Sequence, residues 1–240
     1  MRWTFKPQPD SLQAEALQES LQIDALTARL LVQRSITTFD QARQFFRPSI
    51  ADLHDPFLMK DMDLAVNRIE AALAKSEKIL VFGDYDVDGT TAVSLVSAYL
   101  KTRTDQVATY IPDRYIEGYG VSFQGIDFAV DNDFTLIIAL DCGIKSIDHV
   151  FYAQERGIDF IICDHHRPGE TLPQAVAVLD PKRDDCAYPY DELCGCGIGF
   201  KLIQALAQNQ NQDVEELLPY LDLVATAIAA DIVPMTGENR

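Results

Sequence analysis

Five short apolar runs alternate with segments of helical periodicity, and this alternation limits the possible fold more than any other feature. The apolar runs cover residues 78–83, 106–112, 134–141, 158–164 and 175–180. Their near-continuous apolar character is typical of strands that are buried on both faces of a sheet. The alternation therefore predicts an α/β fold, with a parallel sheet that helices cover on both faces.

Helical spacing also extends over residues 11–47, and Pro48 ends this small helical unit. We therefore expect a helical N-terminal region over residues 1–55 and an α/β domain over residues 56–240. The last part of the second domain, residues 197–230, is also predicted to be mainly helical.

The composition is that of an ordinary globular protein, with 48% hydrophobic and 24% charged residues among 240. No apolar run approaches the ~20 residues that cross a bilayer, and the N-terminus lacks the apolar core of a signal peptide. We expect a cytoplasmic protein without a membrane partner. The five cysteines match no zinc-binding spacing and are predicted to be small buried thiols.

The net charge of -17, with a pI near 4.4, bears directly on the choice of partner. Taken alone, this charge argues against a partner as anionic as a nucleic acid. Bound divalent ions would cancel part of it, because each ion neutralises two negative charges.

The stretch VFGDYDVDGTTA crowds three aspartates, Asp84, Asp86 and Asp88, into five residues. Carboxylates this close repel one another, so a cation is expected to compensate. A calcium-binding EF-hand loop begins in the same way, but it needs a glutamate at its twelfth position, where this chain has Leu95. The aspartates also follow a predicted strand and precede a predicted helix, which disfavours the calcium loop.

Further polar residues end other predicted strands. Asp141 ends one strand, and Asp164 ends the next and is followed by His165 and His166. Asp231 follows a later apolar stretch. Ligands of parallel sheets bind beyond the carboxyl ends of the strands, so these side chains are expected to converge. Carboxylates with imidazole favour manganese or another transition metal, and two such ions are the usual apparatus for phosphodiester hydrolysis.

Four segments, in this order, resemble the motifs of the Asp-His-His (DHH) phosphoesterases. They are DYDVDG, ALDCG, CDHH and ADIVP, and the resemblance to the family extends over residues 78–234. Within that family the chain most resembles the RecJ branch of single-strand-specific exonucleases. Residues 30–69 and 110–121 carry this closer resemblance, as do GCGIGFKLIQAL and DIVPMTGENR.

The resemblance implies roles for individual residues. The metal ligands would be Asp84, Asp86, Asp88, Asp141, His165 and Asp231, with Asp84 either a ligand or a partner of one. The catalytic residues would be Asp141, which would bridge two divalent ions, together with His165 and His166. Manganese is the expected metal and magnesium the second choice. A related pyrophosphatase branch has a histidine where this chain has Phe82, which leaves the surroundings of one ion open.

The substrate-binding residues are expected to be His166 and the basic or glycine residues nearest the motifs. These are Arg114, Gly195, Gly197 and Lys201. Arginine suits bidentate recognition of phosphate, and backbone amides at a helix start can approach a phosphate.

The implied function is metal-dependent 5′-to-3′ hydrolysis of single-stranded DNA, which releases 5′-mononucleotides in recombination and repair. The implied partners are single-stranded DNA, a single-strand-binding protein and a helicase, and the chain is expected to be a monomer. An alternative is a DHH phosphodiesterase for cyclic dinucleotides or short oligonucleotides, which the acidic charge favours. A third is a metal-dependent DNA-binding protein without activity, which is disfavoured because every motif ligand except that at the Phe82 position is present. RecJ-like chains continue into a second, DHHA1-type domain, so this chain resembles their N-terminal part.

Overall fold

The computed structural model describes residues 3–240 and divides them into two compact units. One unit comprises the residues up to Leu53 together with Arg240, and the other runs from His54 to Asn239. The first unit contains helices α1 (Ser11–Leu21), α2 (Ala25–Val32) and α3 (Phe39–Phe46). Its small core consists of Leu17, Leu31, Ile36 and Ala42.

The second unit contains five parallel strands in the order β2-β1-β3-β4-β5. The strands are β1 (Lys78–Gly83), β2 (Val107–Tyr110), β3 (Phe134–Leu140), β4 (Asp159–Cys163) and β5 (Ala177–Leu179). All five lie where the apolar runs predicted them, so the predicted parallel α/β fold is confirmed. Because β1 pairs with both β2 and β3, the direction of winding changes between β1 and β3. Open sheets of this kind bind their ligands beside such a switch point.

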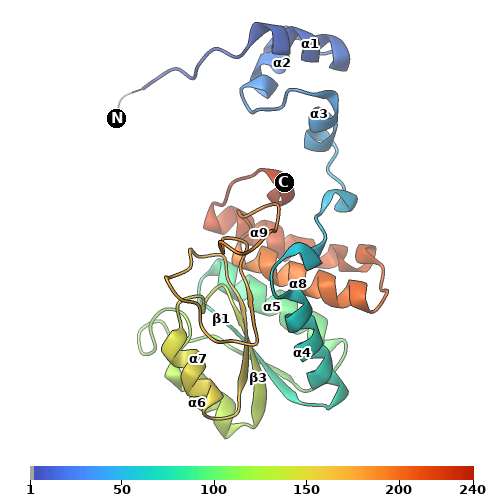
Figure 1. Ribbon diagram of the computed structural model, residues 1–240. Coiled ribbons are helices and arrows are strands. Elements are labelled where there is room, and N and C mark those ends of the chain that lie inside the picture. Colours follow the sequence, from blue (N-terminus) through green and yellow to red (C-terminus); the bar gives the residue numbers. More distant parts are fainter. Residues whose placement is uncertain (1–2) are drawn as a thin grey trace. The chain divides into compact units, whose positions relative to one another are not determined.

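Helices cover both faces of the sheet. On one face lie α4 (Met62–Ala74), α5 (Val87–Lys101) and α8 (Gly195–Asn209), and α9 (Leu221–Asp231) packs on α5 and α8. On the other face lie α6 (Phe123–Asp131) and α7 (Ile147–Gln154), as Figure 1 shows. Residues 3–240 also contain four short 3-10 helices, one in the first unit at Ile50–Asp52 and three in the second at Pro56–Leu58, Val214–Tyr220 and Gly237–Asn239.

The strands alternate their side chains between the two faces. Leu80, Ile137 and Phe160 belong to the core beneath α6 and α7. Their neighbours Ile79, Leu136 and Ile161 are equally buried, and the period of two places them on the opposite face. Both faces therefore need apolar residues, which explains the near-continuous apolar runs in the sequence.

Helix α5 begins earlier than the sequence pattern indicated. All three aspartates were expected to precede this helix, but Asp86 caps it by accepting a hydrogen bond from the Gly89 amide at 2.9 Å. Asp88 therefore lies in the first helical turn, where its carboxylate interacts favourably with the helix dipole. The acidic run thus has a structural part in starting α5 as well as its predicted part in cation binding.

No helix among residues 3–240 is both long enough and apolar enough to cross a membrane.

Replacing Ile137 with alanine should destabilise the second unit by about 2–5 kcal/mol, because a fully buried side chain in the central strand leaves a cavity. Urea unfolding followed by circular dichroism measures this change. Ile147→Ala is the control, because Ile147 is 43% exposed on α7 and should cost no more than about 1 kcal/mol. Equal effects of the two substitutions would contradict the described core.

Candidate metal centre

Three neighbouring strands deliver polar side chains to the same edge of the sheet. Asp84 follows β1, Asp141 follows β3, and Asp164 with the two histidines follows β4. Asp84, Asp141 and Asp164 are all at most 1% exposed. The structure thus brings these strand ends together, and helices α5 and α9 add further carboxylates to the cluster.

Asp141 lies at the centre of this cluster. Its backbone has a left-handed φ of 59°, which aspartate tolerates better than most residues. Its amide donates to the Cys163 carbonyl at 2.8 Å, but its buried Oδ1 accepts no hydrogen bond within the described chain. Burial, reinforced by the negative charges of Asp88 and Asp86, raises the pKa of Asp141 to about 10. A buried carboxylate in this position needs either a proton or a cation.

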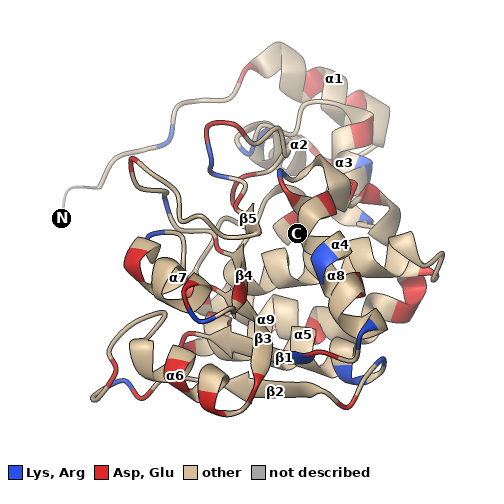
Figure 2. Ribbon diagram, turned by 60° about the horizontal axis from the view of Figure 1, so that its bottom comes forward, with Lys and Arg blue, Asp and Glu red and all other residues tan. Residues whose placement is uncertain are grey.

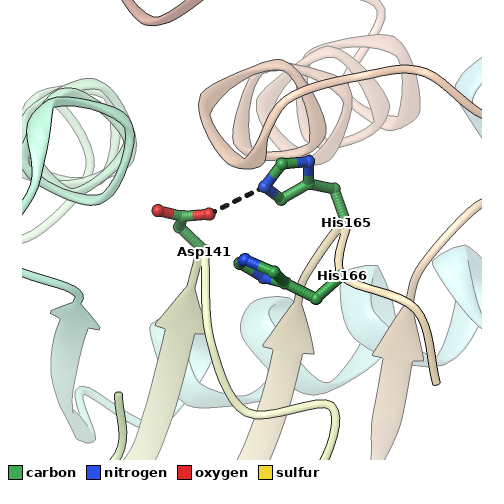
Figure 3. Close-up of side chains that lie close together, drawn as sticks. All are labelled: Asp141, His165 and His166. Atoms are coloured by element: carbon green, nitrogen blue, oxygen red, sulfur yellow. Dashed lines mark ion pairs between the residues drawn. The ribbon is translucent and has the colours of Figure 1, made fainter. Parts of the chain in front are cut away.

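His165 points its Nε2 atom at three carboxylates. The distances are 3.2 Å to Oδ1 of Asp141, 3.7 Å to Oδ2 of Asp88 and 3.8 Å to Oδ2 of Asp231 (Figure 3 shows the first). The ring is nearly buried, and its Nδ1 atom has no hydrogen-bond partner among residues 3–240. An imidazole nitrogen surrounded by carboxylate oxygens is a suitable donor set for a transition metal ion.

Three groups of side chains could each hold an ion, because their ligand atoms lie within 4.8 Å of one another. They are Asp141 with His165 and His166, Asp88 with His165 and Asp231, and Asp84 with Asp86 and Asp141. Asp141 and His165 each belong to two groups. The three groups therefore form one continuous cluster of possible ligands, joined through Asp141 and His165.

Asp88 also joins helix α5 to the start of helix α8. Its Oδ2 accepts from the Gly195 amide at 2.6 Å, and its Oδ1 accepts from the Cys196 amide at 2.7 Å. These amides lie at the N-terminus of α8, where the helix dipole favours an anion. Burial nevertheless raises the pKa of Asp88, against the effect of these hydrogen bonds.

Gly195 allows helix α8 to approach Asp141 closely. A Cβ atom at position 195 would lie 2.6 Å from Cβ, 2.7 Å from Oδ1 and 2.9 Å from Cα of Asp141. Since one of these atoms belongs to the backbone, no side-chain rotation could relieve the contact. The absence of a side chain at Gly195 therefore helps to set the position of the central carboxylate.

Comparisons with known proteins agree with this geometry. A sequence model described as "DHH family, N-terminal domain" matches residues 78–228. The chain belongs to the DHH family.

The curated relatives of this DHH chain include single-stranded-DNA-specific exonucleases named RecJ. The RecJ of Bacillus subtilis (strain 168) is 42% identical over 240 residues, which are 100% of this chain and 30% of the relative. The RecJ of Dickeya dadantii (strain 3937) is 35% identical over 228 residues, 91% of this chain and 39% of the relative. The predicted resemblance to DHH and RecJ proteins is thereby confirmed, and this chain spans 30–39% of the length of these two relatives.

Two solved RecJ structures resemble the DHH chain. A crystal structure of exonuclease RecJ bound to manganese has a TM-score of 0.71 and 32% identity, covering 80% of this chain and 47% of that one. The RecJ of Thermus thermophilus in complex with Mn2+ has a TM-score of 0.82 and 26% identity, covering 100% and 33%. Both relatives were solved with manganese, the ion that the DHH chain was predicted to bind.

Asp164 has a different role in the DHH motif from its two histidine neighbours. Its Oδ1 accepts from the amides of His165 and His166 at 2.8 and 3.1 Å and lies 2.8 Å from Nδ1 of His166. Its Oδ2 accepts from the Ile144 amide at 2.9 Å. The pKa of Asp164 lies below its ordinary value. Burial alone would raise this pKa, but the hydrogen bonds from His166 and the backbone have the larger, opposite effect. Asp164 therefore shapes the turn that presents both histidines.

The predicted substrate-binding residues differ in whether their polar groups are free to meet a substrate. Arg114 is exposed in the loop after β2, with its guanidinium 5.2 Å from the ring centre of Tyr85. The Gly195 amide donates to Asp88, and the Gly197 amide donates to Sγ of Cys194 at 3.3 Å. These two amides are thus already paired, so they are not free to bind a phosphate.

Lys201 is not available to a substrate in this geometry. It is 1% exposed, and its ammonium lies 2.5 Å from Oε1 of Glu238 and 3.0 Å from the His54 carbonyl. The prediction for Lys201 therefore has no support from its surroundings. Its basic character fits a buried ion pair that holds residues 237–239 against α8.

Asp180 is a buried carboxylate at this edge of the sheet that the sequence analysis did not single out. It follows β5, it is fully buried, and its Oδ2 has no hydrogen-bond partner within the described residues. Burial raises the pKa of Asp180 to about 7. The signal was present in the sequence, because Asp180 ends the fifth apolar run in the same way that Asp141 ends the third.

Replacing Gly195 with alanine should weaken Mn2+ binding at least about tenfold, because the added Cβ would displace Asp141. Isothermal titration of the chain with manganese chloride measures the affinity. Gly197→Ala is the matched control on the same helix, because its Cβ would make an ordinary 3.5 Å contact with Leu193. Unchanged affinity in the Gly195 variant would show that this close packing does not set the site.

Replacing Asp180 with asparagine should flatten the pH dependence of stability. Between the ordinary pKa of 3.8 and about 7, folded Asp180 keeps a proton that the unfolded chain releases, so stability falls as the pH rises through this window. Urea unfolding of the metal-free chain at about pH 5 and about pH 8 gives the difference. Asp184→Asn, a change in an exposed neighbour on the same loop, should keep the wild-type difference.

Proposed function

We propose that this chain carries the metal-dependent phosphodiesterase site of a single-strand-specific DNA exonuclease. The observation that carries this proposal is the convergence of oxygen and imidazole ligands around the buried Oδ1 of Asp141, which accepts no hydrogen bond among residues 3–240 and lies 3.2 Å from Nε2 of His165. We infer the substrate, single-stranded DNA, from the names of the RecJ relatives. As the resemblance implies, the reaction would run from the 5′ end and release 5′-mononucleotides in recombination and repair.

The ligand groups suggest how two ions would be divided. Asp84, Asp86 and Asp141 would hold one ion, and Asp88, His165 and Asp231 would hold the other, with Asp141 between them. Manganese fits this set best and magnesium second, because imidazole stands among the carboxylates. Two bound ions would supply an acidified water and would stabilise the charge that develops on the phosphoryl oxygens.

The protein residues around the ions would bind and orient the substrate. His166 lies at the exposed side of the cluster, with 43% of its side chain accessible, and is the residue we assign to the scissile phosphate. Arg114 would contact a backbone phosphate, and the exposed ring of Tyr115 would stack on a base. These residues lie in the segment after β2, close in sequence to Tyr119, which reaches His166.

All six proposed ligands come from one chain, so a monomer suffices to build the site. We further propose that the protein acts in the cytoplasm, where a helicase would supply single strands and a single-strand-binding protein would cover them. These partners follow from the proposed activity and from the resemblance.

The acidic charge favours a second candidate, a phosphodiesterase for cyclic dinucleotides or short oligonucleotides. Figure 2 shows acidic segments on helices such as α1 and α6, so the negative charge is not confined to the ligand cluster. Two divalent ions would cancel only four units of the net charge of -17. Short substrates with few phosphates would meet less repulsion than a long strand.

Replacing Asp141 with asparagine should reduce hydrolysis and Mn2+ affinity by more than about a hundredfold, because the shared ligand would lose its charge. Asparagine tolerates the left-handed φ at this position, so the fold should persist. Release of nucleotides from a labelled single strand, with circular dichroism as the folding check, measures the effect. Asp127→Asn on the exposed face of α6 is the control and should keep full activity.

Offering the same protein a long single strand and a cyclic dinucleotide separates the two candidate functions. Faster cleavage of the single strand supports the exonuclease. Exclusive cleavage of the cyclic dinucleotide would replace it with the second candidate. Substantial turnover by the Asp141 variant on either substrate would contradict the metal site itself.

A further inference from the structure

His166 is held at both ring nitrogens by protein groups. Its Nδ1 lies 2.8 Å from Oδ1 of Asp164, and its Nε2 lies 3.2 Å from the hydroxyl of Tyr119. Figure 3 shows that its ring extends toward Asp141 beside that of His165. Asp164 is buried and firmly bonded to the backbone, so the Nδ1 side of the ring has a fixed partner.

Tyr119 reaches His166 from a loop that is closed by Glu117. Oε1 of Glu117 accepts from the Asp113 amide at 2.8 Å, which closes the start of the loop. Oε2 of Glu117 accepts from the hydroxyl of Tyr110, at the end of β2, at 2.9 Å and from the hydroxyl of Ser122, which caps α6, at 2.5 Å. The carboxylate of Glu117, which no part of the proposed hydrolysis uses, therefore joins the two ends of the loop.

The two neighbours of Tyr119 are glycines with left-handed backbones. Gly118 has a φ of 86° and Gly120 has a φ of 79°, values that other residues adopt only with strain. The Gly120 amide lies 3.4 Å from Oδ1 of Asp84. The ring of Tyr119 also packs edge-on against Tyr85, with ring centres 6.1 Å apart. These contacts direct the hydroxyl of Tyr119 towards the histidine.

A phenolic hydroxyl suits this position because it both donates and accepts hydrogen bonds. It can donate to Nε2 of a neutral His166 and can accept from Nε2–H of the protonated ring. The ring thus keeps one orientation in either state. A phenylalanine would keep the edge contact with Tyr85 but would leave Nε2 without this partner.

We propose that Tyr119 is a positioning residue that holds the imidazole of His166 in the orientation in which it meets the scissile phosphate. The expected effect on catalysis rests on the proposed function, whereas the orientation of the His166 ring does not depend on it. Tyr119 thereby links the loop that carries Arg114 and Tyr115 to the reacting end of the site. Removing its hydroxyl should slow the reaction step more than it weakens substrate binding.

The test compares Tyr119→Phe with the wild-type chain in two measurements. In the metal-free chain labelled with 15N-histidine, the Nε2 resonance of His166 should shift in the variant, and only four histidines contribute signals. In cleavage of a single-stranded oligonucleotide with manganese, kcat should fall about tenfold, the worth of one ordinary hydrogen bond, with KM within about twofold. Tyr152→Phe is the control, because its hydroxyl bonds Asp127 between α6 and α7 at 2.8 Å and should change neither result.

The outcomes separate this inference from the proposed function. An unchanged Nε2 resonance overturns the positioning of the ring, whatever the activity. A rise in KM with unchanged kcat would mean that Tyr119 only stacks on the substrate, and a rise in kcat would mean that it obstructs His166; either overturns the proposal. If the wild-type chain cleaves no phosphodiester, the proposed function fails, and the resonance still decides whether Tyr119 orients His166.

Discussion

The buried carboxylate of Asp141 is the constraint on which the rest of the site depends. Its Oδ1 accepts no hydrogen bond from any described residue, and the negative charges of Asp86 and Asp88 lie nearby. Leaving such a group ionised and unpaired in an apolar interior costs several kcal/mol. Two neighbouring features place hydrogen-bond donors or a basic group beside these carboxylates. His165 faces Asp141, and helix α8 directs its first amides at Asp88.

The order of the strands in the sheet brings these side chains together. Because β1 and β3 are adjacent, the residues that follow them, Asp84 and Asp141, emerge beside each other although the chain between them forms β2 and two helices. The pairing of β3 with β4 then adds the two histidines. Helix α8 covers these strands on one face, and its close approach at Gly195 determines how far the central carboxylate can extend.

The fold was predictable from sequence because both faces of the sheet are buried, which makes each strand an apolar run. The grouping of Asp84, Asp141 and His165 was predictable for a related reason, since the ends of parallel strands share one edge. Lys201 was not predictable, because its role depends on Glu238, which is far along the chain and becomes its partner only after folding. The prediction that the amides of Gly195 and Gly197 bind a phosphate could not take their partners into account. Only the folded structure shows that these amides donate to Asp88 and Cys194.

Asp231 differs from the other members of the cluster because it ends a helix rather than following a strand, and it lies at the surface. An ion shared by Asp88, His165 and Asp231 would be a cross-link between the sheet edge, α5 and the outermost helical layer. Part of the free energy of ion binding would then add to the resistance of these layers to separation. An ion bound there for the proposed hydrolysis would also hold α9 against the rest of its unit.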